Sequence, residues 1–129
     1  MDIPSLDDIC FINRRLIEAA TGRWEPPDNL LNPAPLQYAL EAVSVTVAGV
    51  ELPPGLVRKA ASIGWAIATR HPFFDTNKRT AAETTFVVLQ LNGRRVTVSS
   101  AEIVAIMLGI AEHRVSFDEW VDWLEARVV

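Results

Sequence analysis

The chain has 129 residues, half of them hydrophobic, which is enough for one compact core, so we expect a single domain over residues 1–129. Its 12 Lys and Arg against 16 Asp and Glu give a net charge of −4, which excludes a general electrostatic attraction to nucleic acid or to an anionic membrane. A single cysteine, an acidic N-terminus and the lack of an apolar stretch of about 20 residues exclude a disulfide framework, a signal peptide and a membrane span, and they predict a cytoplasmic protein.

The first helix is predicted by a capping box and a helical repeat. Ser5 and Asp8 stand three residues apart at its start, where each side chain can bond the backbone N–H of the other residue. Apolar residues then recur at helical spacing, namely Ile9, Ile12, Leu16 and Ala20. We expect Gly22 to end this helix in a left-handed conformation. Residues 23–33, with three prolines and two asparagines, should form a loop.

Two further helices are predicted before residue 71. Proline suits the first turn of a helix, so Pro33–Pro35 and Pro53–Pro54 are expected to mark their starts. The first of them should finish by Gly49, and the second should run to about Arg70. Their inward faces are predicted to be Leu36, Ala39, Leu40 and Val43 in one, and Leu56, Ala60, Ile63 and Ile67 in the other.

The fourth helix is expected to follow the sequence HPFFDT. Pro72 disfavours helical geometry at His71, so residues 71–76 should form a loop, and Asn77 should open a helix that reaches Asn92–Gly93. The run TTFVVLQL inside this segment is as β-branched as a strand, but the unbroken pattern is too long for a typical strand. We therefore predict a helix that is buried on most sides.

Two more helices complete the predicted fold. Residues 95–99 favour a short extended piece or half of a small hairpin. Ser100 is expected to cap a fifth helix that runs through about Glu112. A second capping box, at Ser116, predicts a last helix that ends near Arg127. The fold class is therefore all-α, a compact bundle of about six helices whose buried central helix follows the predicted loop.

The segment from His71 to Arg79 combines groups that suit the handling of a phosphate. The first turn of a helix leaves backbone N–H groups unpaired and carries partial positive charge, so it binds anions. Asn77, Lys78 and Arg79 add an amide and two cations to that turn. Asp75 lies just outside it, where a Mg²⁺ ion shared with a phosphate would sit, and His71 can accept a proton from a hydroxyl. The combination predicts phosphoryl or nucleotidyl transfer.

Most of these residues also have a simpler interpretation. His71, taken alone, is typical of a loop or a helix end. Asp75 is suited to capping the helix and nothing more. Lys78 and Arg79 can form a solvated pair, although the helix dipole disfavours cations on a first turn unless an anion is present. Phe73 and Phe74 are expected to lie in the core.

The segment HPFFDTNKR resembles the signature of the Fic/Doc family, whose Doc branch reads H-x-F-x-(D/N)-(A/G)-N-K-R. The residues on specified motif positions are His71, Phe73, Asp75, Asn77, Lys78 and Arg79. The resemblance implies the Fic fold, with ATP and Mg²⁺ as cofactors. It also implies that His71 activates the target hydroxyl and that Asp75 holds the metal. The residues that it places on the nucleotide phosphates are Thr76, Asn77, Lys78 and Arg79, the last two also acting in catalysis.

Two positions point to the Doc branch. The adenylylating branch has glycine where this chain has Lys78, and a further arginine where it has Ala82. The resemblance therefore implies a kinase of Doc type, which transfers the terminal phosphate of ATP to a threonine or serine of a translation factor, of the elongation factor Tu type. Thr76 stands where the branch has alanine or glycine, and it can cap the helix or crowd the nucleotide. The alternatives are adenylyl transfer and a catalytically silent binding module.

The resemblance also implies a partner. Family members often carry an inhibitory helix of their own. Thr21 and Glu25 have the matching spacing, but Gly22 breaks the helix and Pro26 follows. A separate antitoxin is implied instead, with a helical segment that folds into a groove on this domain. No nucleic acid and no membrane is expected among the partners.

Overall fold

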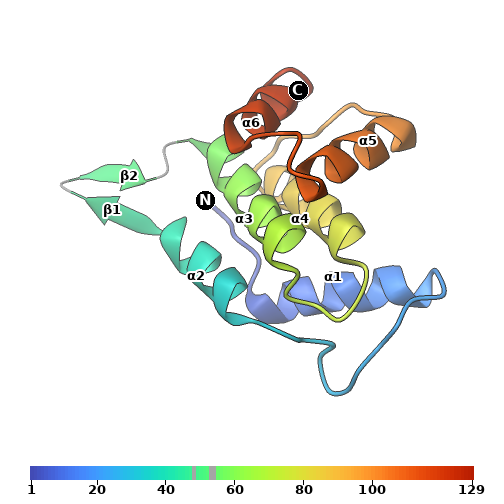
Figure 1. The fold of residues 1–129 in the computed structure, drawn as a ribbon. Coiled ribbons are helices and arrows are strands. Elements are labelled where there is room, and N and C mark those ends of the chain that lie inside the picture. Colours follow the sequence, from blue (N-terminus) through green and yellow to red (C-terminus); the bar gives the residue numbers. More distant parts are fainter. Residues whose placement is uncertain (48, 53–54) are drawn as a thin grey trace.

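The computed structural model describes residues 1–47, 49–52 and 55–129. These residues form six helices and one small hairpin (Figure 1). The helices are α1 (Leu6–Glu18), α2 (Ala34–Ala42), α3 (Leu56–Arg70), α4 (Asn77–Leu91), α5 (Ser100–Ala111) and α6 (Phe117–Glu125). The all-helical prediction is thus confirmed, with the hairpin as an addition. None of the described helices is long and apolar enough to cross a membrane.

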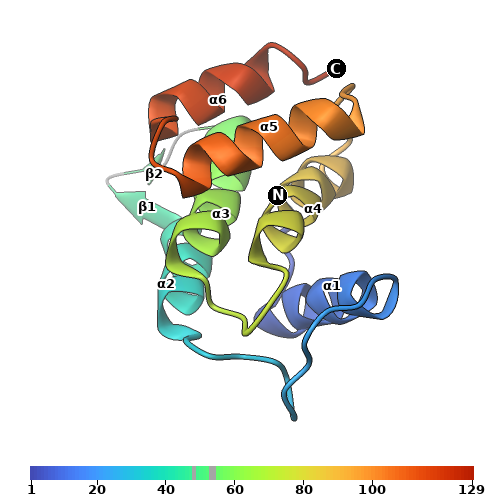
Figure 2. The ribbon, with the colours of Figure 1, turned by 45° about the vertical axis from the view of Figure 1, so that its right-hand side comes forward.

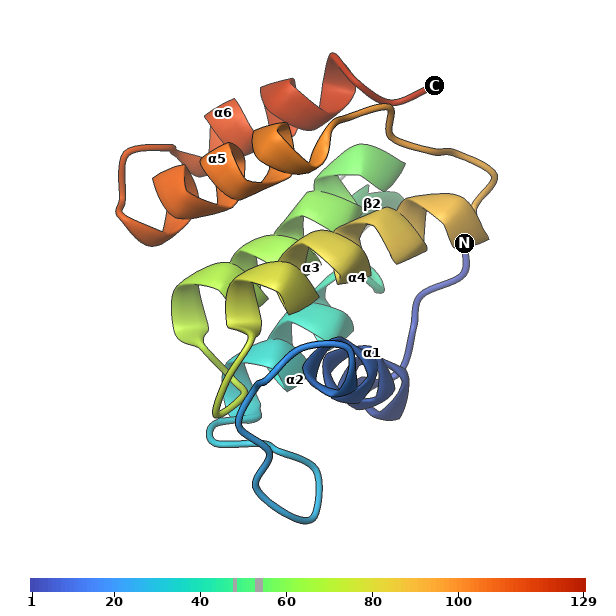
Figure 3. The ribbon, with the colours of Figure 1, turned by 90° about the vertical axis from the view of Figure 1, so that its right-hand side faces the viewer.

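The helices stack in three layers (Figures 2 and 3). α3 and α4 lie side by side in the middle layer, with α1 and α2 on one side and α5 and α6 on the other. The middle pair packs closely because Gly64 of α3 faces Thr85 of α4 without an intervening side chain. Most faces of α4 are buried, as predicted; its buried residues are Thr80, Ala81, Ala82, Thr84, Thr85, Val88 and Leu89.

Serine capping boxes begin three of the six helices. Ser5 caps α1 and Ser116 caps α6, both as predicted. Ser99 caps α5, one residue before the predicted Ser100, and Glu102 completes the box. Each box pairs two N–H groups that the first turn of a helix otherwise leaves without acceptors. The local sequence therefore fixes these starts to within one residue.

The end of α1 differs from the prediction. α1 is capped at Ala19 in right-handed helical geometry, and Gly22 lies in the loop that follows. A Cβ atom on Gly22 would stand 3.1 Å from both Ile17 Cγ1 and Thr76 Oγ1. The loop passes close to Ile17 and Thr76 at this position, and glycine allows this because a side chain would crowd both neighbours. Ala20, the last residue of the predicted helical repeat, lies beyond α1 and is exposed.

A hairpin that the sequence analysis did not predict follows α2. α2 ends at Ala42, and β1 (Val45–Val47) pairs with β2 (Val50–Leu52) in antiparallel register at the periphery of the bundle (Figure 1). Gly49 turns with φ of 80°, which glycine adopts readily. The β-branched run at 45–47 before this glycine and Val50 after it favour strands, so the signal was present in the sequence. The predicted helix start at Pro53–Pro54 lies outside the described residues.

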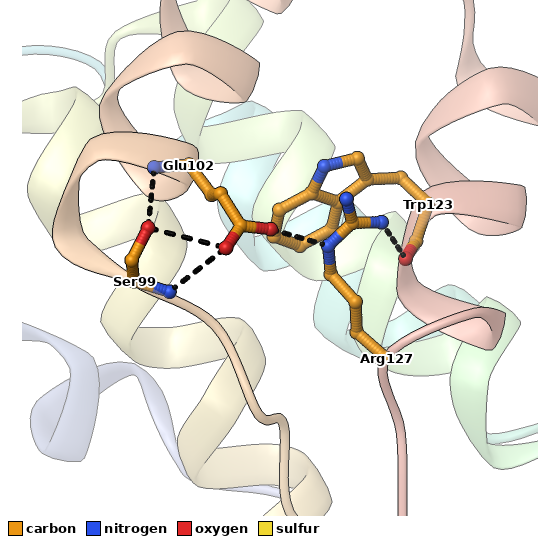
Figure 4. A network of polar contacts seen from close by, with 4 residues as sticks. All are labelled: Ser99, Glu102, Trp123 and Arg127. Atoms are coloured by element: carbon orange, nitrogen blue, oxygen red, sulfur yellow. Dashed lines mark hydrogen bonds and ion pairs between the residues drawn. The ribbon is translucent and has the colours of Figure 1, made fainter.

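The extended segment at 95–99 pairs with the C-terminal residues. Val96 forms an isolated antiparallel bridge with Val128, so the predicted extended piece finds its partner at the end of the chain. Nearby, Arg127 lies 4.3 Å from the ring centre of Trp123 and donates to Glu102 at 3.0 Å (Figure 4). These contacts join α5 to the end of α6.

Acid is expected to weaken this junction. The pKa of the Glu102 carboxyl lies below its ordinary value, first because the Arg127 side chain donates to it and then because Ser99 does. A carboxyl with a lowered folded pKa contributes stability above its unfolded pKa and loses that contribution as the pH falls through the folded value. Glu102→Gln should therefore narrow the difference in Tm between neutral pH and about pH 3. Glu125→Gln is the matched control, because that carboxylate has no hydrogen bond or ion pair with the described residues.

Candidate functional site

A pocket of about 370 Å³ lies where the α3–α4 loop meets the first turn of α4. It is lined by the six residues predicted as a site, which are His71, Asp75, Thr76, Asn77, Lys78 and Arg79. The rest of its wall consists of Phe74 and of residues 20–22, which follow α1. We call this the motif pocket. A larger groove of about 710 Å³ runs between α2 and α3, but it contains none of the six.

The first turn of α4 presents unpaired donors to the motif pocket. The first hydrogen bond of α4 runs from the Thr80 N–H to the Thr76 carbonyl, at 3.0 Å. The N–H groups of residues 77–79 precede it and have no acceptor within the helix. Lys78 and Arg79 are exposed, and this turn carries no acidic residue. Donors, dipole and two cations therefore favour an anion at this place.

Asn77 uses its side chain inside the loop. Its Nδ2 donates to the Phe73 carbonyl and its Oδ1 accepts from the Phe73 N–H, both at 3.0 Å. This differs from the expected use of the amide as a phosphate donor. Phe73 itself is 1% exposed and lies in the core, as predicted, whereas Phe74 is half-buried at the pocket wall. One N–H of the Asn77 amide and its Oδ1 are thus used within the loop, while its backbone N–H belongs to the first turn of α4.

The Asp75 carboxylate joins the loop after α1 to the start of α4. Its Oδ2 accepts from the Arg23 N–H and its Oδ1 from the Thr76 N–H, each at 2.7 Å. An ionised carboxylate has about four lone-pair directions, so each oxygen keeps room for another partner. No cluster of three His, Cys, Asp or Glu side chains suited to a metal occurs in the described part of the chain. A single carboxylate with phosphate and water oxygens is a usual environment for Mg²⁺, so Asp75 fits that ion.

Thr76 has a left-handed backbone, with φ of 65° and ψ of 32°. It precedes α4 as the N-cap residue but makes no capping bond through its hydroxyl, so the first of its two suggested roles, capping the helix, is wrong. A β-branched residue is strained in this region, where glycine is not. Thr76 therefore carries a backbone cost that glycine would not have at this position.

Thr76→Gly is expected to raise stability by about 1 kcal/mol, because it relieves the left-handed threonine. Chemical unfolding measures the change. Thr21→Gly is the matched control, since Thr21 borders the same pocket with an ordinary φ and should gain nothing. Equal stability of wild type and Thr76→Gly would contradict the strain.

His71 ends α3 in a left-handed conformation, with φ of 48° and ψ of 62°. Its N–H donates to the Ile67 carbonyl at 3.3 Å, and the residue is exposed at the motif pocket. The predicted interruption of the helix before Pro72 is confirmed. Its imidazole is thus accessible to a second molecule that approaches the pocket.

Sequence reasoning missed the residues beneath the motif pocket. Asn13, Asn29 and Thr80 are fully buried and bond the loop from below. The one sequence signal for Asn13 is its place four residues after Ile9, on the inward face of α1. That spacing alone does not distinguish an asparagine that holds the loop from one that is merely tolerated in the core.

Comparison with known proteins assigns the family. The sequence matches the Fic/DOC family over residues 3–89, which is well over half of the chain and includes the whole motif. A search of curated proteins gave no match. With its six helices and a motif whose residues line one pocket, the chain belongs to the Fic/DOC family, whose members are typically transferases.

Proposed function

We propose that this protein is an ATP-dependent protein phosphotransferase and the toxin of a toxin–antitoxin pair. It would transfer the terminal phosphate of ATP to a threonine or serine hydroxyl of a translation factor, of the elongation factor Tu type. The observation that carries the proposal is the motif pocket, where two exposed cations and unpaired N–H groups meet at the start of α4. Such a site suits a polyphosphate.

The proposed roles follow from the positions of the groups. Lys78 and Arg79, with the N–H groups of their turn, bind and neutralise the phosphates. Asp75 holds Mg²⁺, which when bound adds positive charge beside the phosphates. His71, accessible at the edge of the pocket, accepts the proton of the attacking hydroxyl. Thr76 lies against the bound nucleotide.

Two side chains favour phosphate over AMP as the transferred group. Lys78 extends from the first turn of α4 where glycine would leave room for close approach of a phosphate. Ala82, one turn further, is 4% exposed and supplies no cation. Adenylyl transfer is the alternative within the same chemistry, and the mass added to the target distinguishes the two.

A separate antitoxin is part of the proposal. Its helical segment would occupy a groove on this domain and block the motif pocket, within the cytoplasm. A catalytically silent binding module is the rival from another class, and the strained Thr76 favours it. Calorimetry with Mg-ATP separates them, since a silent module that is well folded would give no heat of binding.

The function is tested by expressing the chain in a bacterial host with and without its antitoxin. We expect growth arrest without the antitoxin, and a new phosphothreonine on a translation factor in mass spectra of the host proteins. A variant with both Lys78 and Arg79 changed to alanine should give neither. Arg94→Ala is the control, because that arginine lies outside the motif pocket and its change should leave both effects intact.

A further inference from the structure

A cluster of three buried polar side chains lies beneath the motif pocket. Asn13 of α1, Asn29 of the following loop and Thr80 of α4 are each 0% exposed. None of the three lines the pocket. Polar side chains are seldom buried so deeply unless their hydrogen bonds are satisfied, so their partners indicate what they do. We call them the buried triad.

Asn13 binds both the loop and α4. Its Nδ2 donates to the Asp75 carbonyl and to the Thr80 hydroxyl, each at 3.0 Å. The Thr80 hydroxyl donates in turn to the Thr76 carbonyl, at 2.7 Å. Asn13, 62 residues before Asp75 in the sequence, therefore holds the Asp75 carbonyl directly and the Thr76 carbonyl through the Thr80 hydroxyl.

Asn29 closes the triad from the other side. Its Nδ2 donates to Asn13 Oδ1 at 3.0 Å, and its Oδ1 accepts from the Glu25 N–H at 2.8 Å. Its own carbonyl accepts from the Phe74 N–H, at 3.0 Å. Asn29 is left-handed, with φ of 60°, a conformation that asparagine tolerates better than most residues.

The held peptide groups are those that set the shape of the motif pocket. Residues 74–76 carry the Asp75 carboxylate and lead into the anion-binding turn of α4. Thr76 is strained there, and strained backbone persists only where surrounding contacts over-determine it. An apolar side chain at position 13 would fill the same volume, but it would leave the Asp75 carbonyl without this donor.

We infer that Asn13 is a positioning residue of the motif pocket, acting through the peptide groups of Asp75 and Thr76, with Thr80 and Asn29 as its supports. The inference rests on the proposed function for its effect on catalysis. The predicted effect of Asn13 on the loop is independent of the proposed function, because it can be measured in a protein without any activity. In transfer reactions that depend on placement, a displacement of about 1 Å lowers the rate by about 100-fold.

The first test compares variants of equal size. Asn13→Leu and Thr80→Val keep the volume and remove the donors to the loop. Val121→Ala is the control, because it removes core packing in α6, in the opposite layer. We expect kcat for phosphate transfer to fall by about 100-fold in Asn13→Leu, and the KM for ATP to change less because Lys78 and Arg79 remain. Val121→Ala should lower Tm and leave both constants within about 2-fold.

Two kinetic results would overturn the inference. One is full activity in both Asn13→Leu and Thr80→Val. The other is a Val121→Ala variant that loses as much kcat as Asn13→Leu does when the two variants have the same fall in Tm. The loss of kcat would then follow from lower stability alone. Thr80→Val keeps the test decisive should Asn13→Leu fail to fold.

Hydrogen exchange provides the readout that is independent of activity. The N–H groups of Phe74 and Thr76 should exchange at least about 10-fold faster in Asn13→Leu than in wild type, while those in the middle of α6 keep their rates. Unchanged exchange at these two amides would refute the positioning role. Absence of Mg-ATP binding by the wild-type protein would instead refute the proposed function, and the exchange result would still decide the role of Asn13.

Discussion

His71→Ala is expected to lower phosphate transfer by about 10²–10⁴-fold and to abolish growth arrest, while the protein stays folded. The imidazole is the group proposed to accept the hydroxyl proton, and alanine offers no base in its place. The residue is exposed, and its ring has no hydrogen bond with any described residue, so its loss costs little packing. The measurement is initial rate with a purified translation factor, next to a thermal unfolding curve.

Two further variants separate chemistry from backbone effects. His71→Asn keeps a residue that tolerates the left-handed conformation, and it should be as inactive as His71→Ala. His113→Ala is the matched control, because His113 is also exposed and left-handed, with φ of 59°, but lies outside the motif pocket. It should keep wild-type activity. Toxicity retained by His71→Ala would remove the proposed base from the mechanism.

Gly64→Ala is expected to lower the free energy of unfolding by about 1–3 kcal/mol, although alanine favours helix. A Cβ at this position of α3 would overlap Thr85 Oγ1 and stand 3.2 Å from the Ala81 carbonyl oxygen. Thr85 is fully buried, and its hydroxyl donates to that carbonyl at 2.8 Å, so it has little freedom to move. Either the hydroxyl gives up its bond or α3 moves away from α4.

A double variant tests the cause. Thr85→Ala removes the hydroxyl that the new methyl group would meet, so Gly64→Ala should cost less stability in that background than in wild type. Urea unfolding of the four proteins gives the coupling. Strictly additive losses would show that the contact between Gly64 and Thr85 is not the source of the destabilisation.

The elements that could be predicted are those whose signals are local in the sequence. The serine capping boxes place the starts of α1, α5 and α6 to within one residue, because each depends on residues three apart. The motif is equally local: nine consecutive residues contain seven that line one pocket. A loop followed by a helix start is enough to bring them together.

What could not be predicted depends on contacts between distant segments. The Asp75 carboxylate was expected to be free for a metal, but it also accepts from the Arg23 N–H, 52 residues away in the sequence. The Asn77 side chain, predicted to bind a phosphate, also bonds the Phe73 backbone, because that backbone turns back toward the helix. Asn13 has only its place on the inward face of α1 as a local signal, since its partners are 16, 62 and 67 residues distant.

These long separations bear on when the motif pocket can form during synthesis of the chain. α1 leaves the ribosome first, but Asn13 cannot bond its partners until Thr80 has also emerged. Before that point the nascent chain has neither the α4 turn nor the support beneath it. The motif pocket therefore gains its buried support only after synthesis has passed Thr80.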